Sequence, residues 1–362
     1  MATRNYLEAL LRSGARVAAR PLFFSTDISE CPKSIQNAEK VMLGEYDAVI
    51  IAAPAYCFEI VDATIPHLGL FFTESKPLPQ GWSSHCRLMD HIIHPCSDQR
   101  AWCDAPGFPD SSVVPVPVDV NKYFKSYKKS KHLDGSRFNF YTISDMSKRK
   151  NFEGLLRAYF YGFGATEPVA LTIKTSGDKS QTESFVKAVA DKCNLRAVPP
   201  VNVITDRLSE EEILQLHKSG DCFVSASYGE GWNLPAQDAL LFGKTPIVAA
   251  FGGQKDFVTD KNGWLVDAIE EPCFDAGKTH EELFTGKRVW GSPDLLQIAA
   301  CMREAFSDKG LREEKSEAGM EAAPLFSYEK IGSDLLGVLT NAATQKKEAL
   351  RPAGTAGRNQ LD

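Results

Sequence analysis

The sequence predicts an α/β protein with two domains, each built around a parallel β-sheet. Its 362 residues are 43% hydrophobic and 24% charged, so the chain can bury two cores of ordinary size. Short apolar runs typical of buried strands alternate with amphipathic stretches typical of helices. In residues 221–253, an apolar strand, a turn, a helix and a second apolar strand follow one another. That order is one unit of a parallel sheet.

The first domain is expected over residues 1–134. Its predicted elements are a helix at residues 2–13, ended by Gly14, and strands at residues 15–24, 46–53, 66–72 and 113–119. The boundary to the second domain is expected within residues 134–138.

The second domain is expected over residues 135–326. Its predicted elements are strands at residues 138–143, 169–175, 201–204, 222–226 and 246–250, and helices at residues 152–163, 180–193 and 235–243. Ser209 and Glu212 have the spacing of a capping box, which predicts one more helix. A C-terminal helix is expected at residues 327–345, and the polar tail, residues 346–362, is expected to be disordered.

The loop after the strand at residues 222–226 has the residue types of a ligand site. Gly229 and Gly231 allow a ligand close to the backbone, and Pro235 suits the first position of a helix, whose free N–H groups attract a diphosphate. The carboxylates of Glu230 and Asp238 can accept hydrogen bonds from hydroxyls on either side of that diphosphate, as in a nucleotide-sugar. The alternative is that Asp238 complements the helix dipole and Glu230 is a solvated loop residue.

Residues 230–239, EGWNLPAQDA, resemble the E-G-F/W-x-L-P-x-x-E-A signature of family 4 (GT4) glycosyltransferases. That family has the GT-B fold, in which two Rossmann-like domains face each other across a cleft. The resemblance implies that Glu230 contacts the donor sugar and that Asp238, which stands where the family has Glu, contacts the ribose. It also implies donor contacts from the surrounding loop residues Gly229, Gly231, Trp232, Asn233 and Leu234.

The first domain carries further segments that resemble this family. Residues 74–82, ESKPLPQGW, are similar to its E-T/S-x-x-L-P-x-x-W element. An acid at the carboxyl end of a sheet strand points into the interdomain cleft, so Glu74 is a candidate to orient the acceptor hydroxyl. The family's first strand and glycine-rich loop, which precede the helix at residues 2–13, are missing; either the chain starts late or another segment substitutes.

Residues 90–97 contain His91, His94 and Cys96, which could be imagined as a zinc cluster. A structural zinc site usually needs a fourth ligand, which this segment lacks. The segment resembles instead the D-x-I/V-x-x-P-S junction of the family between a strand and a helix.

Three successive cations, Lys148, Arg149 and Lys150, lie in the turn before the helix at residues 152–163. Their positive field suits a diphosphate leaving group. The turn resembles the family's R-K-N/G element, which implies that Arg149 and Lys150 contact the donor diphosphate and take part in catalysis with Glu230 and Glu74. A solvated basic turn is the alternative.

Residues 121–131 hold five lysines interleaved with aromatic residues. A solvated interdomain linker is one interpretation. The other is a basic patch in which Lys125, Lys128 and Lys129 contact an anionic acceptor such as DNA.

Several functions are made less probable by composition and pattern. The formal net charge of −6 argues against a protein that coats nucleic acid, although it does not exclude a local basic groove. Nine cysteines without a C-x-x-C pair are typical of a reducing cytoplasm, and the lack of any apolar run of about 18 residues predicts a soluble protein with no membrane span. No Asp-x-Asp occurs, so a metal-independent mechanism is expected.

The sequence as a whole indicates a GT-B glycosyltransferase that moves a hexose from a nucleotide-diphosphate sugar, UDP- or GDP-linked, to an acceptor hydroxyl. The family implies retention of anomeric configuration, no bound cofactor and no metal ion. The acceptor is open between a glycan and hydroxymethylated bases in DNA, and the oligomeric state is also open. The rival interpretations are a non-catalytic nucleotide-sugar-binding protein and a GT-B nucleotide-sugar epimerase.

Overall fold

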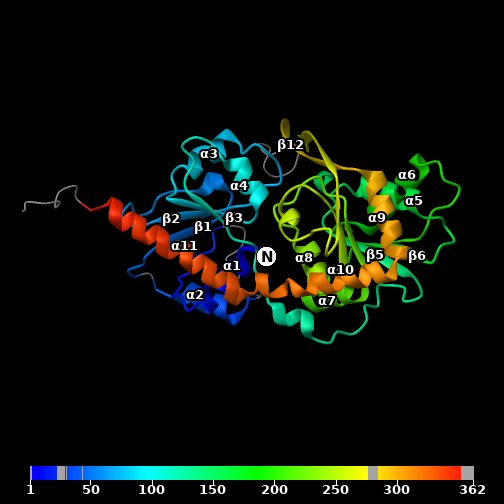
Figure 1. The fold of residues 1–362 in the computed structure, drawn as a ribbon, viewed down its shortest axis with the longest axis horizontal. Coiled ribbons are helices and arrows are strands. Elements are labelled where there is room, and N and C mark those ends of the chain that lie inside the picture. Colours follow the sequence, from blue (N-terminus) through cyan, green and yellow to red (C-terminus); the bar gives the residue numbers. More distant parts are fainter. Residues whose placement is uncertain (1, 23–28, 30, 43, 276–283, 352–362) are drawn as a thin grey trace, which may run out of the picture.

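The chain folds into two α/β lobes that lie side by side (Figure 1). The computed structural model describes residues 2–22, 29, 31–42, 44–275 and 284–351. The first lobe contains a parallel sheet in the order β1-β2-β3-β4, formed by Val49–Ala52, His67–Leu70, His91–His94 and Ser111–Val113. Around this sheet are α1 (Ala2–Arg12), α2 (Lys33–Lys40), η1 (Ala55–Cys57), α3 (Gln80–Cys86) and α4 (Ser97–Cys103). The short helix η2 (Val120–Phe124) follows in the segment that leads to the second lobe.

Two of the strands expected in the first lobe are corrected by the structure. Residues 15–22 form no strand, and residues 23 and 24 lie outside the described part. The N–H of Ala19 donates instead to the carbonyl of Ala38 in α2, and Pro21 has no N–H to give to a sheet. Of the strand expected at residues 113–119, only Val113 lies in a strand, as the last residue of β4. Pro115 and Pro117 interrupt the pairing that would follow.

The second lobe contains a parallel sheet in the order β10-β9-β8-β5-β6-β7. Its strands are β5 (Phe138–Ile143), β6 (Val169–Lys174), β7 (Val201–Ile204), β8 (Cys222–Ser225), β9 (Thr245–Ala249) and β10 (Trp264–Val266). Its helices are η3 (Lys148–Lys150), α5 (Phe152–Gly162), α6 (Lys179–Lys192), α7 (Glu210–Ser219), α8 (Leu234–Leu241), η4 (Gly253–Asp256), α9 (Leu295–Ser307), α10 (Lys309–Glu321) and η6 (Ala323–Phe326). Every strand expected here is present, and Ser209 and Glu212 form the predicted capping box of α7.

The direction of strand addition reverses between β5 and β8. From β5 the chain adds β6 and β7 on one side, and then returns to add β8, β9 and β10 on the other. Neighbouring parallel strands whose crossovers lead in opposite directions leave a crevice at their carboxyl ends, where open α/β sheets bind ligands.

A hairpin absent from the sequence interpretation projects from the second lobe. Strand β11 (Ala268–Phe274) pairs antiparallel with β12 (Thr285–Pro293), and β12 lies between the two lobes in Figure 1. The backbones of Lys76 and Val289 exchange two hydrogen bonds, of 3.0 and 2.7 Å, so β12 also pairs with the first lobe.

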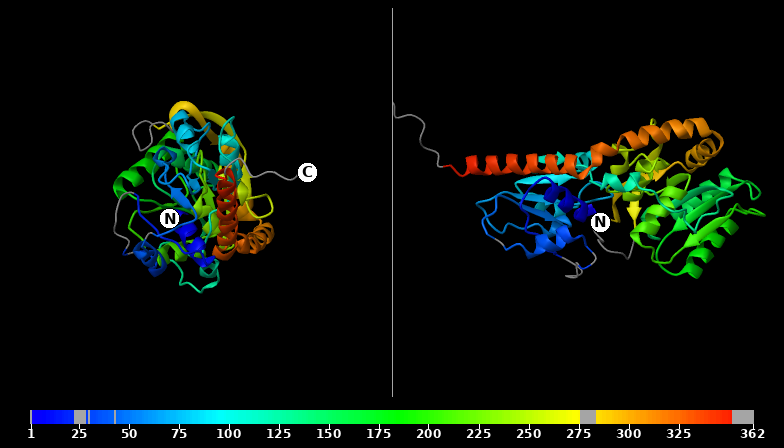
Figure 2. Two further views of the ribbon diagram at one scale, coloured as in Figure 1. Left: turned by 90° about the vertical axis from the view of Figure 1, so that its left-hand side faces the viewer. Right: turned by 90° about the horizontal axis from the view of Figure 1, so that it is seen from below.

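The last helix, α11 (Tyr328–Ala349), returns along the first lobe as a long rod (Figures 1 and 2). It packs so closely on α1 that a Cβ on Gly332 would lie 2.2 Å from the carbonyl oxygen of Ala9. The helix continues beyond residue 345, where the sequence interpretation ended it, and so removes residues 346–349 from the expected disordered tail. Residues 352–362 of that tail lie outside the described part of the chain. Within the described residues, no helix combines the length and apolar character needed to cross a membrane.

Candidate functional site

The switch point of the second sheet brings two loops of the sequence interpretation together. The turn η3 follows β5, and residues 226–233 follow the neighbouring strand β8. The N–H of Tyr228 donates to the carbonyl of Arg149 at 2.8 Å, which ties the two loops to each other. The predicted diphosphate-binding cations and the predicted sugar-binding acid therefore come from adjacent strand ends.

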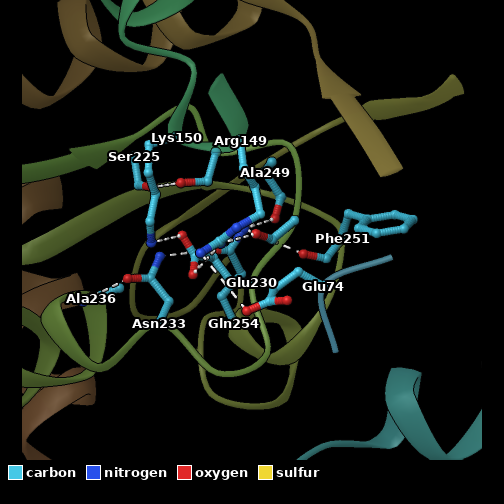
Figure 3. A network of polar contacts seen from close by, with 12 residues as sticks. Glu74, Arg149, Lys150, Ser225, Glu230, Asn233, Ala236, Ala249, Phe251 and Gln254 are labelled. Carbon is cyan, nitrogen blue, oxygen red and sulfur yellow. Dashed lines mark hydrogen bonds and ion pairs between the residues drawn. The ribbon is translucent and has the colours of Figure 1, made fainter. Parts of the chain in front are cut away.

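Glu230 is the centre of a compact charge network (Figure 3). Its carboxylate accepts from Lys150 Nζ at 2.6 Å and from Arg149 Nη1 at 3.1 Å, and the residue is only 5% exposed. Burial alone would raise the pKa of this carboxyl, but Lys150 and Arg149 outweigh burial and lower the pKa to about 2. Glu230 is therefore a buried, ionised carboxylate, which excludes the alternative of a solvated loop residue.

Arg149 links this network to the first lobe. Its guanidinium lies 3.8 Å from the carboxylate of Glu74 and donates to the carbonyl of Gly229 at 2.6 Å. Burial alone would lower the pKa of Arg149, but Glu74 and Glu230 raise it above its usual value, so the side chain stays cationic. The residues predicted as catalytic, Glu74, Arg149, Lys150 and Glu230, thus meet at one place.

The two glycines of the loop make room for the first lobe. A Cβ on Gly229 would lie 2.1 Å from the carbonyl oxygen of Glu74, and a Cβ on Gly231 would lie 3.1 Å from Cβ of Phe72. The segment that follows β2 therefore rests directly on the loop that follows β8.

Two polar residues at the start of α4 complete the contact between the lobes. Asp98 accepts from the N–H of Gly252 and from Lys255 Nζ, both at 2.9 Å, while Asp256 accepts from the N–H and the hydroxyl of Ser97 at 2.7 and 2.8 Å. Sequence reasoning assigned no role to Asp98. The strand-to-helix junction at residues 90–97 was the available signal, because a helix start on the cleft side presents polar groups to the opposite lobe.

Trp232 and Asn233 hold the loop in its conformation. The indole of Trp232 is buried against Phe257 and donates to Oε1 of Gln237 at 3.0 Å. Asn233 adopts a left-handed conformation, with φ of 75°, and its side chain caps the N–H of Ala236 at the start of α8. Leu234 is the first residue of α8.

Asp238 belongs to a different cluster from Glu230. Its carboxylate accepts from Lys122 Nζ at 2.8 Å and from the hydroxyl of Tyr123 at 2.5 Å, both in η2. Burial alone would raise the pKa of Asp238, but Lys122 lowers it below its usual value. The carboxylate of Asp238 therefore contacts the segment that joins the two lobes.

The lysine-rich segment lies along α7. Lys128 and Lys129 line a surface hollow of about 360 Å³ together with residues of α7, among them Glu211 and Glu212. Lys125 follows η2 directly. The residues that line this hollow include none of the four that meet at the switch point, so the structure does not join the lysines to Glu74.

Comparisons with known proteins agree with this fold. Residues 124–271 match the family described as Glycosyl transferases group 1. A D-inositol 3-phosphate glycosyltransferase from Nocardioides sp. is 27% identical over 157 residues, which make up 43% of this chain and 28% of that protein. The chain thus matches less than a third of the length of this curated relative.

Solved structures resemble most of the chain, over 76% to 95% of its length. Sucrose-phosphate synthase from Thermosynechococcus elongatus superposes with a TM-score of 0.63 at 13% identity, covering 95% of this chain and 93% of its own. HepE from Anabaena, in complex with UDP and glucose, gives 0.54 at 15% identity over 76% of this chain and 72% of its own. A TarM mutant from S. aureus gives 0.54 at 14% identity, and the match spans 51% of its length.

The expected fold is therefore confirmed: the chain has the two-domain GT-B architecture, and its residues 124–271 match the glycosyl transferases group 1 family.

Proposed function

We propose that this protein is a family 4 glycosyltransferase that moves a hexose from a nucleoside-diphosphate sugar to a hydroxyl group of an acceptor. The proposal rests above all on the meeting of Arg149, Lys150 and Glu230 at the switch point of the second sheet, with Glu74 of the first lobe beside them. It is supported by the group 1 domain and by solved neighbours that hold UDP together with a sugar.

Arg149 and Lys150 would bind the donor diphosphate. Both cations lie in a turn at the carboxyl end of β5, and both pair here with the same buried carboxylate, that of Glu230. A diphosphate carries more negative charge than one carboxylate, so it can take over part of this pairing and leave Glu230 free to accept from hydroxyls of the sugar. The same two cations would stabilise the charge that develops on the leaving nucleoside diphosphate.

The transfer step we propose needs no protein nucleophile. The bond between the anomeric carbon and the phosphate oxygen breaks, and a bond to the acceptor oxygen forms on the same face of the sugar. The proton of the acceptor hydroxyl passes to the departing phosphate oxygen, while Glu74 orients that hydroxyl. The sequence holds no Asp-x-Asp, so we propose that Arg149 and Lys150 supply the charge stabilisation without a metal ion.

The donor we propose to test first is a UDP-hexose, because UDP is the nucleotide in several solved neighbours. The acceptor we propose is a sugar hydroxyl rather than DNA. Lys131 of the basic segment pairs with Glu212 at 3.6 Å, and Lys128 and Lys129 share their hollow with two glutamates, which weakens the case for a polyanion groove.

Mass spectrometry of transfer products tests the proposal. UDP-, GDP- and ADP-hexoses are offered with a glycan panel and with duplex DNA that carries 5-hydroxymethylpyrimidines. A hexose mass shift on a glycan, lost in Glu230→Gln, supports the proposal, whereas a shift on DNA alone would replace the acceptor class. Nucleotide binding without turnover would indicate a non-catalytic binding protein. A change in the configuration of the donor sugar without transfer would indicate an epimerase.

A further inference from the structure

The hairpin strand β12 touches both loops that carry the site acids. On one side, the N–H of Gly291 donates to the carbonyl of Tyr228 at 2.7 Å, and the rings of Trp290 and Tyr228 stack with centroids 4.6 Å apart. On the other side, Val289 pairs through its backbone with Lys76. Four consecutive residues of β12, starting at residue 288, therefore join the Glu230 loop to the Glu74 segment.

Arg288 grips the residues on both sides of Glu74. Its Nε donates to the hydroxyl of Ser75 at 3.0 Å, and its Nη2 donates to the hydroxyl of Thr73 at 3.3 Å and to the carbonyl of Ser75. Thr73 and Ser75 are fully buried, and Arg288 itself is 3% exposed. Burial lowers the pKa of Arg288 to about 10, which still leaves the guanidinium charged at neutral pH.

These contacts fix the segment that carries Glu74. Residues 74 and 75 form a bend after β2 and belong to no strand. Arg288 holds Thr73 and Ser75 on either side of Glu74, and the carboxylate of Glu74 lies 3.8 Å from Arg149. Gly229, in the loop that follows β8, has no side chain, so the backbone of Glu74 can lie directly against this loop.

We propose that Arg288 is a positioning residue of the transfer reaction, which fixes Glu74 at the donor site through Thr73 and Ser75. This inference rests on the proposed function. In this inference, the hairpin of β11 and β12 holds Glu74 at a fixed position beside Arg149 and Lys150. A lysine cannot replace Arg288 in this role, because a single ammonium lacks the planar fork that reaches both hydroxyls at once.

A kinetic double-mutant cycle tests the proposal. The rate of UDP-glucose consumption, by transfer and hydrolysis together, is measured for Glu74→Gln, Arg288→Met, Arg288→Lys and the double variant Glu74→Gln with Arg288→Met. Misplacing Glu74 is expected to lower kcat by about 10- to 100-fold with little change in the KM of UDP-glucose. The double variant should lose no more than Glu74→Gln alone, and Arg288→Lys should recover only a small part of the rate.

Arg303→Met is the matched control, because the exposed Arg303 pairs with Glu167 away from the site. It should keep the wild-type rate. Losses that multiply in the double variant, or a normal kcat in Arg288→Met, would overturn the positioning role.

Hydrogen exchange keeps this test separate from the proposed function. A wild type that binds UDP but consumes no UDP-glucose would contradict the transferase, and the exchange of amides 73–76 would still decide the role of Arg288. We expect Arg288→Met to raise their exchange rates about tenfold over Arg303→Met. Equal rates in the two variants would show that Arg288 does not hold the Glu74 segment.

Discussion

In the proposed function, Glu230 combines a structural and a chemical role in one side chain. It is buried and ion-paired with Lys150 and Arg149, so truncation to alanine would leave two buried cations without their partner. Glu230→Gln keeps the volume and removes the charge. We expect this variant to lower kcat/KM by about 100-fold or more, because the sugar loses a charged acceptor. Circular dichroism checks that the fold persists, and an unchanged rate would remove Glu230 from the reaction.

The carboxylate of Glu230 also makes the stability of the folded protein depend on pH. Its pKa is lowered from 4.5 to about 2 in the folded protein, so its contribution to stability is complete above about pH 4.5 and is lost as the pH falls through about 2. The free energy of unfolding should therefore drop more steeply between these pH values in the wild type than in Glu230→Gln. Urea titrations at several pH values measure both slopes, and parallel slopes would contradict the assigned ion pairs.

Asp238 is where the family resemblance and the local contacts point in different directions. The resemblance implies a contact with ribose, whereas its carboxylate here is held by Lys122 and Tyr123. Breaking a buried ion pair typically costs about 3 to 5 kcal/mol. We expect Asp238→Ala to lower the melting temperature markedly and to change the Kd of UDP by less than about threefold, since the contact to one hydroxyl is the smaller term. A stable variant that binds UDP weakly would favour the ribose role.

At the scale of elements, the loop after β8 depends on a glycine at position 229. A Cβ at Gly229 would lie 2.1 Å from the carbonyl of Glu74, so Gly229→Ala must push the two lobes apart locally. We expect a loss of about 1 to 3 kcal/mol in stability and a fall in turnover. Gly135→Ala is the control, because nothing lies within 4 Å of a Cβ there. Equal effects of the two substitutions would refute the close approach.

The sequence predicted the elements of the second lobe because each is a regular local pattern. The strands Phe138–Ile143 and Val201–Ile204 were found with their bounds, and the cap at Ser209 follows from a spacing of three residues. The hairpin of β11 and β12 was missed because β11 is mostly exposed, and because Trp290 of β12 is buried by Tyr228 and Phe251, which lie far away in the sequence. The strand expected at residues 15–24 is absent from its described part, residues 15–22. Local apolar content was present there, but α2 supplied the hydrogen-bond partner.

In the candidate site, too, sequence patterns identified some residues, whereas contacts between distant residues emerged only from the structure. Motif and charge selected Glu230, Arg149, Lys150 and Glu74, and the structure brings these four together. The partners of Asp238 and the role of Arg288 are invisible in the sequence, because each contact joins residues more than 100 positions apart.

At the scale of the whole molecule, the two lobes are held together around the candidate site. Arg149 with Glu74, Lys255 with Asp98, and β12 with Lys76 each cross from one lobe to the other. A buried cluster that includes Leu70 and Trp232 continues between the lobes. The site acids and cations thus lie where both lobes contribute, as the proposed transfer between a donor and an acceptor on opposite lobes requires.

The most direct test of this account is calorimetric titration of UDP into the wild type, Arg149→Met and Lys150→Met. Each cation should contribute a charge-assisted hydrogen bond to the diphosphate, so we expect each substitution to weaken the Kd by about 10- to 100-fold. Lys309→Met, at an exposed pair in α10, should bind as the wild type does. Unchanged affinity in both site variants would contradict the assignment of the switch point as the donor diphosphate site.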